Sequence, residues 1–335
     1  MTDWLVQGLI PQGHCVLTVG EPHAMKSWML EHLAICVASG QPFLGELDVK
    51  QQQVIIVDED TPTEVLNTRI DRFCLGMNLS RTELEKENLI VRSMTGFQFM
   101  KNDDIDYLKL LSSISPPSLI IIDSLTTSSI GYDLNQTVDA MKVAKRWSKL
   151  KENGNTLIVS HHLSLKLHNG YVNTPDELER RVMGNTQLVA QCDTLLGVIR
   201  RKTKEASAGI ISKSRRTLLN VSSLTMELRE PKDQSWARLI MLEDSPDLPT
   251  DGCRRVLPYY TVDAVPSLTP KELSKISNGE YREQEARDIL RELEQHDVLK
   301  REMGLGKDKR FTYVLNPDFL KPRSLSNEYW DALRV

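Results

Sequence analysis

The stretch that decides the fold is Gly20-Glu21-Pro22-His23-Ala24-Met25-Lys26-Ser27. It follows the phosphate-loop pattern of a glycine, four variable residues, then glycine, lysine and serine or threonine, except that Met25 occupies the second glycine position. An apolar run at 15–19 precedes the loop, and an amphipathic stretch at 28–39 follows it. In this strand–loop–helix context, backbone N–H groups and the helix N-terminus would cradle phosphates. The stretch therefore predicts a nucleotide-binding site.

The individual loop residues have separate expected roles. Lys26 is expected to reach the β and γ phosphates of ATP, and Ser27 to offer its hydroxyl to Mg²⁺. The rest of the expected nucleotide-binding loop is Gly20, Glu21, Pro22, His23, Ala24 and Met25. Met25 leaves an alternative open, because a glycine there would adopt backbone angles that a side chain resists. On that alternative, the loop is a tight strand–helix turn without nucleotide binding.

The composition is that of an ordinary globular protein. A chain of 335 residues is long enough for one large α/β domain and a small appendage. The formal net charge is −4, so any nucleic-acid surface must be local. The five cysteines are scattered without close pairs, which favours reduced thiols and a cytoplasmic protein over a metal site. Neither a signal peptide nor a membrane-spanning segment is expected.

Short apolar runs alternate with amphipathic helical stretches through the first two thirds of the chain. The runs are 15–19, 54–57, 89–91, 119–122 and 156–159, and the helix candidates are 28–39, 62–76, 103–113 and 135–152. This alternation predicts an α/β fold with a central, mostly parallel sheet flanked by helices on both faces. After residue 193, further apolar runs predict a β-rich extension of the same sheet. Ligands bind beyond the carboxyl ends of such strands, where we expect the site.

Acidic residues follow two of the buried runs. Asp123 directly follows the fourth run in the Walker B arrangement, in which the carboxylate holds the magnesium–water shell. Glu59 comes shortly after the second run. Helix capping by Asp60 or Thr61 accounts for the residues beside it and leaves Glu59 free for catalysis.

The fifth run ends in Ser160-His161-His162. Two adjacent histidines on a strand cannot point the same way, so one is expected to face the nucleotide and sense its γ phosphate. The alternative is a strand end whose polar groups are satisfied locally.

Taken together, these motifs resemble the RecA-like ATPases, in particular the RepA-type branch found in plasmid, phage and mobile-element replication modules. The resemblance covers about residues 4–230. The matching stretches are 4–11, 20–27, 38–45, 59–62, 119–123, 160–162 and 184–193. Related sequences often lack the glycine before the loop lysine, which fits Met25. The resemblance implies ATP hydrolysis with Mg²⁺, self-association into a six-membered ring, single-stranded DNA as a partner, and contact with replication proteins.

The resemblance also assigns catalytic roles. Glu59 would be the base that positions the attacking water, and His162 would be the γ-phosphate sensor. Lys213 and Arg215 resemble the Lys-x-Arg element of ring helicases, which completes the ATP site of a neighbouring subunit. A cation supplied in this way stabilises the charge on the transferring phosphoryl group. The alternative for these two residues is a solvated basic turn between two strands.

A long polar stretch at 163–184 corresponds to the loop that lines the central channel in RecA-like rings. Its residues Lys166, Arg180 and Arg181 are expected to contact the phosphates of single-stranded DNA without sequence preference. The alternative is a flexible insertion, because three carboxylates dilute the basic charge of this stretch.

The chain is expected to divide into a RecA-like ATPase domain at 1–243, a proline-rich linker at 244–267, a small domain at 268–321 and a tail at 322–335. The small domain combines two helices with a β-hairpin, which resembles a winged helix. Its hairpin tip is expected to contact nucleic acid through Lys307, Lys309 and Arg310. The charges on its second helix are mixed, so DNA docking and protein docking both remain open.

Three functions follow from these patterns. The first is a hexameric ATPase that tracks single-stranded DNA as a replicative helicase of a mobile element. The second is an ATP-dependent regulatory or assembly switch that binds DNA or a replication partner without unwinding. The third is a degenerate ATPase retained as a DNA-binding protein, against which the intact set of Lys26, Ser27, Glu59 and Asp123 argues.

Overall fold

The structure is a computed structural model, and it divides the chain into two compact units, Met1–Glu243 and Asp244–Val335. It describes residues 2–164, 175–200, 207–217, 219, 223–242, 267–277, 281–295, 299–303 and 311–315. The expected linker up to residue 266 and the expected tail lie outside the described residues. So do Lys166, Lys307, Lys309 and Arg310.

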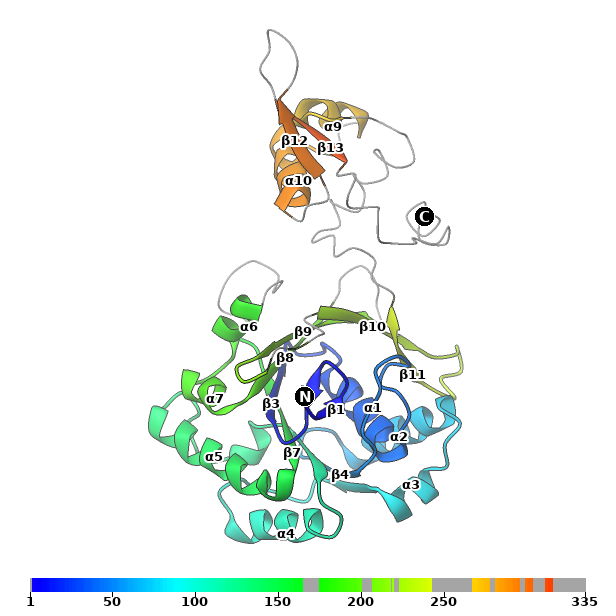
Figure 1. Cartoon of the computed structure of the whole chain (residues 1–335), viewed down its shortest axis with the longest axis vertical. Coiled ribbons are helices and arrows are strands. Elements are labelled where there is room, and N and C mark those ends of the chain that lie inside the picture. The colour runs from blue at the N-terminus through cyan, green and yellow to red at the C-terminus, as the bar shows by residue number, and fades with distance from the viewer. Residues whose placement is uncertain are drawn as a thin grey trace. The chain divides into compact units, whose positions relative to one another are not determined.

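The larger unit is built on a nine-stranded sheet in the order β11-β10-β9-β8-β3-β7-β6-β4-β5 (Figure 1). The strands are β3 (Cys15–Gly20), β4 (Gln53–Asp58), β5 (Leu89–Ser93), β6 (Ser118–Asp123), β7 (Thr156–His162), β8 (Thr194–Arg200), β9 (Ser207–Ser214), β10 (Ser223–Arg229) and β11 (Arg238–Leu242). Strands β3 to β8 pair in parallel, and β9, β10 and β11 continue the sheet antiparallel. The predicted α/β class and the predicted β-rich extension are confirmed.

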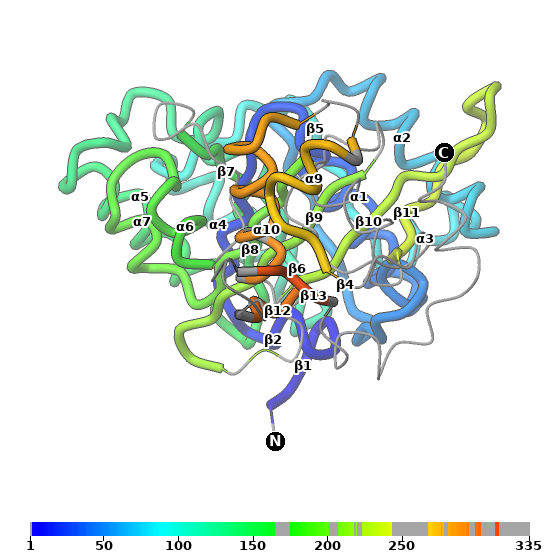
Figure 2. The backbone as a smooth tube through the Cα atoms, turned by 90° about the horizontal axis from the view of Figure 1, so that it is seen from above, coloured from blue at the N-terminus to red at the C-terminus, as the bar shows by residue number. Residues whose placement is uncertain are grey.

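Helices cover both faces of this sheet. They are α1 (Lys26–Ser39), α2 (Thr63–Gly76), α3 (Arg81–Glu87), α4 (Asn102–Ser112), α5 (Thr137–Leu150), α6 (Pro175–Arg181) and α7 (Thr186–Gln191). Helices α1, α2 and α3 lie on one side, and α4, α5 and α7 lie on the other (Figure 2). Within the described residues, no helix combines the length and the apolar character needed to span a bilayer.

The four predicted helices are present as α1, α2, α4 and α5. Helices α3, α6 and α7 were not predicted, because six or seven residues are too few to display a helical period. A short antiparallel pair, β1 (Trp4–Val6) with β2 (Ile10–Pro11), also escaped prediction for lack of length.

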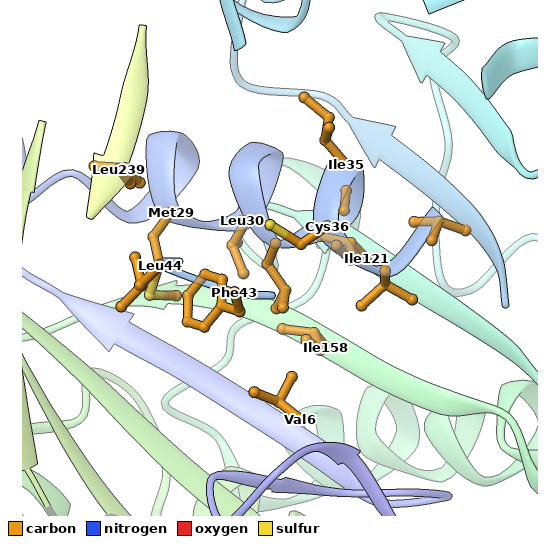
Figure 3. Close-up of a cluster of buried hydrophobic side chains, with 14 of the residues drawn as sticks. Val6, Met29, Leu30, Ile35, Cys36, Phe43, Leu44, Ile121, Ile158 and Leu239 are labelled. Atoms are coloured by element: carbon orange, nitrogen blue, oxygen red, sulfur yellow. The ribbon is translucent and has the colours of Figure 1, made fainter. Parts of the chain in front are cut away.

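The parallel strands are apolar throughout because their side chains alternate between two cores. In β6, Ile121 belongs to the core under α1 and α2, whereas Ile120 and Ile122 belong to the core under α4 and α5. Figure 3 shows part of the first core, where Leu30 of α1 and Ile121 belong to one cluster of buried side chains. Burial on both faces holds the strand ends in a fixed register, and these ends carry the polar site residues.

The smaller unit contains α9 (Pro270–Ile276), α10 (Glu283–Gln295) and the antiparallel pair of β12 (Leu299–Met303) with β13 (Phe311–Leu315). Helix α9 begins with a capping box. The Glu272 amide donates to Thr269 Oγ1 at 3.2 Å, and the Thr269 amide donates to Glu272 Oε2 at 2.7 Å. Two helices followed by a strand pair is the order that the sequence predicts.

Candidate nucleotide-binding site

The phosphate loop lies between the end of β3 at Gly20 and the start of α1 at Lys26. His23 has φ of 62° and Met25 has φ of 70°, so both adopt the left-handed backbone region that glycine ordinarily supplies. Met25 therefore takes the conformation of the glycine that it replaces. The first N–H groups of α1 have no carbonyl partner within the helix, and they remain available to an anion.

Position 20 requires glycine because the loop lies close to the neighbouring strand. A Cβ atom at this position would lie 2.4 Å from the carbonyl oxygen of Val198 in the adjacent strand β8. Such a contact is far too short, so a side chain here would push the loop away from the sheet.

Lys26 and Ser27 connect the loop to its surroundings. Lys26 Nζ donates to the carbonyl oxygens of Gly20 and Glu21, each at 3.1 Å. Ser27 Oγ donates to Asp123 Oδ2 at 2.7 Å, and Asp123 is buried at the end of β6. Burial raises the pKa of Asp123, and the Ser27 hydrogen bond opposes that shift. A hydroxyl beside a buried carboxylate, at a helix N-terminus, fits Mg²⁺ bound to ATP.

A second carboxylate, that of Asp58, ends β4 directly opposite Asp123. Asp58 Oδ1 accepts the backbone N–H groups of Asp60 at 2.9 Å and Thr61 at 2.7 Å. Burial, followed by the charge of Asp123, raises the pKa of Asp58 to about 6. The prediction that Asp60 or Thr61 caps α2 is wrong. The N-cap is Pro62 without a side-chain cap, and Asp58, the last residue of β4, organises the turn instead by accepting the Asp60 and Thr61 amides.

The Glu59 carboxylate is bound by the loop that follows β5. Its Oε1 accepts the Thr95 amide at 2.9 Å, the Thr95 hydroxyl at 2.8 Å and the Phe97 amide at 3.1 Å. Its Oε2 accepts the Gly96 amide at 3.0 Å. All of these donors lie on one short loop, so this conformation holds the carboxylate there and Glu59 is not placed as a free base.

Asp60 is the exposed acidic residue whose charge acts on the phosphate loop. Burial lowers the pKa of Lys26, and the charges of Asp123 and then Asp60 oppose that shift. Asp60 also contributes to raising the pKa of Asp123, after burial has made the largest contribution. The sequence pattern directed attention to Glu59 and did not anticipate that the charge of Asp60 acts on Lys26 and Asp123.

The two histidines that end β7 have different environments. His161 is buried, its Nε2–H donates to the carbonyl oxygen of Met183 at 2.9 Å, and burial lowers its pKa to about 4. His162 lies opposite Gly20 in the pairing of β3 with β7. Burial and the charge of Lys26 lower the pKa of His162, and Asp60 opposes them. His162 is thus the histidine that lies among the charges of the phosphate loop.

Lys213 and Arg215, at the end of β9, are paired with α6 of their own chain. Lys213 Nζ donates to Asp176 Oδ1 at 2.6 Å and to Glu179 Oε2 at 2.7 Å. Arg215 Nη2 donates to Glu179 Oε1 at 2.6 Å. The two cations therefore do not form a purely solvated turn. They are ion-paired with two carboxylates of α6.

The stretch 163–184 is not a loop throughout, because α6 occupies its second half. Arg180 is exposed on this helix, whereas Arg181 is 8 % exposed and its Nη2 donates to Glu21 Oε1 at 3.0 Å. The expectation that Arg181 contacts DNA is corrected accordingly, since its guanidinium is buried against the phosphate loop. No sequence signal could have found this pair, because its two members are 160 residues apart.

Comparison with known proteins supports the fold. Residues 1–166 match a family model described as an AAA domain. The structure is similar to that of the ATPase domain of G40P, with a TM-score of 0.50 and 13 % identity over 69 % of this chain and 86 % of that one. A KaiC-like protein from Pyrococcus horikoshii OT3 aligns with a TM-score of 0.46 and 14 % identity, over 71 % of this chain and 94 % of that one. No curated protein sequence matches the chain significantly.

The sheet order and the similarity to the ATPase domain of G40P lead to one structural conclusion. The chain has the fold of a RecA-like ATPase, with the loop 20–27 between β3 and α1 and Asp123 as the last residue of β6.

Proposed function

We propose that the chain binds and hydrolyses ATP with Mg²⁺, and that it works as a RepA-like ring of six subunits on single-stranded DNA. The observation that carries the ATPase proposal is the 2.7 Å hydrogen bond between Ser27 and Asp123. These residues come from the two motifs that an ATP-bound Mg²⁺ needs, and they are 96 positions apart in the chain. A chance resemblance in either motif alone would not bring the two oxygens together.

In the proposed mechanism, residues of one subunit and of its neighbour have separate roles in ATP hydrolysis. Mg²⁺, when bound, neutralises charge on the β and γ phosphates. Lys26 would exchange its two carbonyl contacts for phosphate oxygens. His162 would report the presence of the γ phosphate to the segment that follows β7. Glu59 would position the attacking water after it leaves the loop that now holds it.

The proposed ring requires Lys213 and Arg215 to exchange partners. In the isolated subunit both cations are neutralised by α6, through Asp176 and Glu179. These ion pairs are partly exposed, and such pairs contribute only about 0–1 kcal/mol each. A neighbouring ATP, which carries several negative charges, would compete effectively for the same two cations.

Nucleic acid would meet the subunit near α6 and at the smaller unit. Arg180 remains the described basic residue that we assign to phosphate contacts, together with Lys166, Lys307, Lys309 and Arg310. The smaller unit has the element order of a winged helix, which supports docking on DNA or on a replication protein. The four described cysteines are buried, unpaired thiols, in line with a cytoplasmic protein.

A second function, a nucleotide-dependent switch, is favoured by the position of Glu59. The loop at 95–97 donates four hydrogen bonds to the Glu59 carboxylate, so in this conformation the carboxylate is not free to act as a base. If that arrangement persisted with ATP bound, hydrolysis would be slow, and the chain would act by assembling on DNA rather than by unwinding it.

The deciding experiment measures ATP hydrolysis by the purified protein with and without single-stranded DNA, beside Lys26→Ala and Asp123→Asn. Turnover that DNA stimulates at least about tenfold and that both variants abolish would support the motor, and an unwinding assay would follow. Slow turnover that is indifferent to DNA would reject the motor and leave the switch. Absence of both nucleotide binding and turnover would reject both proposals.

A further inference from the structure

The phosphate loop contains a carboxylate where a phosphate ligand would be repelled. Glu21 directly follows Gly20, and its side chain is 38 % exposed. Its backbone carbonyl is already a partner of Lys26. A negative charge within several ångströms of a triphosphate opposes binding by an amount comparable with an ion pair of the opposite sign. A phosphate-binding loop that contains Glu21 is therefore expected to have a positive charge nearby that neutralises this carboxylate.

Arg181 has the position and the charge to do so. Its Nη2 donates to Glu21 Oε1 at 3.0 Å, and its side chain is 9 % exposed, so the guanidinium is largely shielded from water. The same Nη2 lies 3.5 Å from the carbonyl oxygen of Ser164. Arginine is well suited to buried ion pairs because its guanidinium is planar and weakly hydrated. Salt and water screen the attraction within a partly buried ion pair less than within a surface pair.

The backbone around Arg181 is tied to the strand ends of the site. The Ser164 amide donates to the Arg181 carbonyl at 2.8 Å, and the Met183 amide donates to the His162 carbonyl at 3.1 Å. The Leu163 amide donates to the Gly20 carbonyl at 3.2 Å. Thus the segment after α6 is hydrogen-bonded to the end of β7, which is itself hydrogen-bonded to the first residue of the phosphate loop.

Helix α6 is also packed tightly against the sheet. A Cβ atom on Gly197 of β8 would lie 2.4 Å from Leu178 Cδ1, so Leu178 of α6 packs directly on this glycine. The buried Leu178 side chain thus anchors on the sheet the helix that carries Arg181.

The structure assigns Arg181 as a positioning residue of the phosphate loop, which neutralises Glu21 and holds its carboxylate in an ion pair. This role rests on the proposed binding of ATP, and it replaces the role in DNA contact expected from the sequence. Arg181 does not touch the reacting atoms. It acts through Glu21, so its effect must disappear when Glu21 carries no charge.

A double-mutant cycle on nucleotide affinity tests this assignment. The dissociation constant of Mg²⁺–ADP is measured by calorimetry for the wild type, Arg181→Gln, Glu21→Gln and the double variant. Arg181→Gln is expected to weaken binding about tenfold or more, because Glu21 is left as an unpaired negative charge. The double variant is expected to return to within about threefold of the wild type.

Two further variants make the result specific. Arg229→Gln, at an exposed position at the end of β10, is the control and should leave nucleotide affinity unchanged. Arg181→Lys should retain most of the affinity, because it keeps the charge. Single-stranded DNA binding without nucleotide and the melting temperature of the nucleotide-free protein are measured for each variant. Arg181→Gln should change neither by more than Arg229→Gln does.

The outcomes separate this inference from the proposed function. If the wild type does not bind nucleotide, the proposed function fails. If the wild type binds but Arg181→Gln binds equally well, the positioning role is wrong and the proposed function stands. An affinity loss that Glu21→Gln does not restore also overturns the role. Loss of DNA binding alone would return Arg181 to the DNA surface.

Discussion

Glu59 and Thr95 are joined by two hydrogen bonds to one carboxylate oxygen, from the Thr95 amide at 2.9 Å and from its hydroxyl at 2.8 Å. This relationship separates Glu59 from the phosphate loop although its backbone lies beside the Walker B strand, where the Glu59 amide donates to the Asp123 carbonyl at 2.6 Å. The backbone of Glu59 is therefore tied to the end of β6, and its carboxylate is bound by the loop at 95–97.

The roles of Glu59 and Asp60 can be separated by matched amide substitutions. Glu59→Gln is expected to lower kcat at least about a hundredfold, because a positioned base contributes about 10²- to 10⁴-fold. Asp60→Asn should lower it less than about tenfold, since Asp60 acts only through its charge. Steady-state ATP hydrolysis measures both. The reverse order would make Asp60 the base and leave Glu59 as a structural anchor of the loop.

Loosening the contact at Thr95 should favour release of Glu59. Thr95→Val keeps the side-chain shape and removes one of the four donors to the carboxylate. We expect kcat to rise about two- to fivefold, in proportion to about 0.5–1 kcal/mol for the lost hydrogen bond. An unchanged or lower kcat in single-turnover hydrolysis would show that the loop holds the productive position of Glu59.

Glu179 controls the availability of the two cations near α6. Glu179→Gln weakens its contacts to both Lys213 and Arg215 and should raise DNA-stimulated turnover about two- to fivefold, as expected for a partly exposed pair. Asp176→Asn is the matched control. Among the described cations, Asp176 is paired with Lys213 alone, and its side chain is 73 % exposed, so the effect of this substitution should be smaller. A fall in turnover with Glu179→Gln would mean that Glu179 presents the cations rather than restrains them.

Met25, like His23, adopts a strained left-handed backbone conformation in the phosphate loop. Met25→Gly removes that strain but also the packing of the side chain against the core, so the unfolding free energy should change by less than about 1 kcal/mol. Met25→Val places a β-branched residue at φ of 70° and should destabilise by about 2 kcal/mol. Urea unfolding measures both. Equal stability of the two variants would show that the loop relaxes to another conformation.

Glu31 makes stability depend on pH. Burial raises its pKa to about 8, and the ion pair with Arg69 at 3.2 Å only partly opposes that shift. The folded protein therefore binds this proton more strongly than the unfolded chain does. Stability from this group is complete below the unfolded pKa near 4.5 and is lost as pH rises through about 8.

This sign can be tested between pH 6.5 and 8, above the ordinary histidine pKa of 6.5. Over that interval the wild type should lose up to about 2 kcal/mol of unfolding free energy, and Glu31→Gln should remove most of this slope. Glu64→Gln, at an exposed position of α2, is the control. A slope that survives in Glu31→Gln would assign the pH dependence to another group.

Most of the central sheet could be predicted because parallel strands buried on both faces must be apolar throughout. The runs that became β4 and β6 are of this kind, and each ends in the carboxylate where the buried run stops. Short elements were missed for the opposite reason. Helix α6 has seven residues and lies in a polar stretch, so it is too short to show a helical period in the sequence, and Leu178 packs it on Gly197 of the sheet.

By itself, the sequence determined the α/β alternation and predicted the phosphate loop and the Walker B carboxylate, because each is a pattern of contiguous residues whose chemistry is local. Only the tertiary structure decided which charged groups meet. It paired Arg181 with Glu21, held Glu59 on the loop at 95–97 and joined Lys213 to α6. Such partners lie dozens of residues apart, and their choice depends on burial and distance, which arise only when the chain is folded.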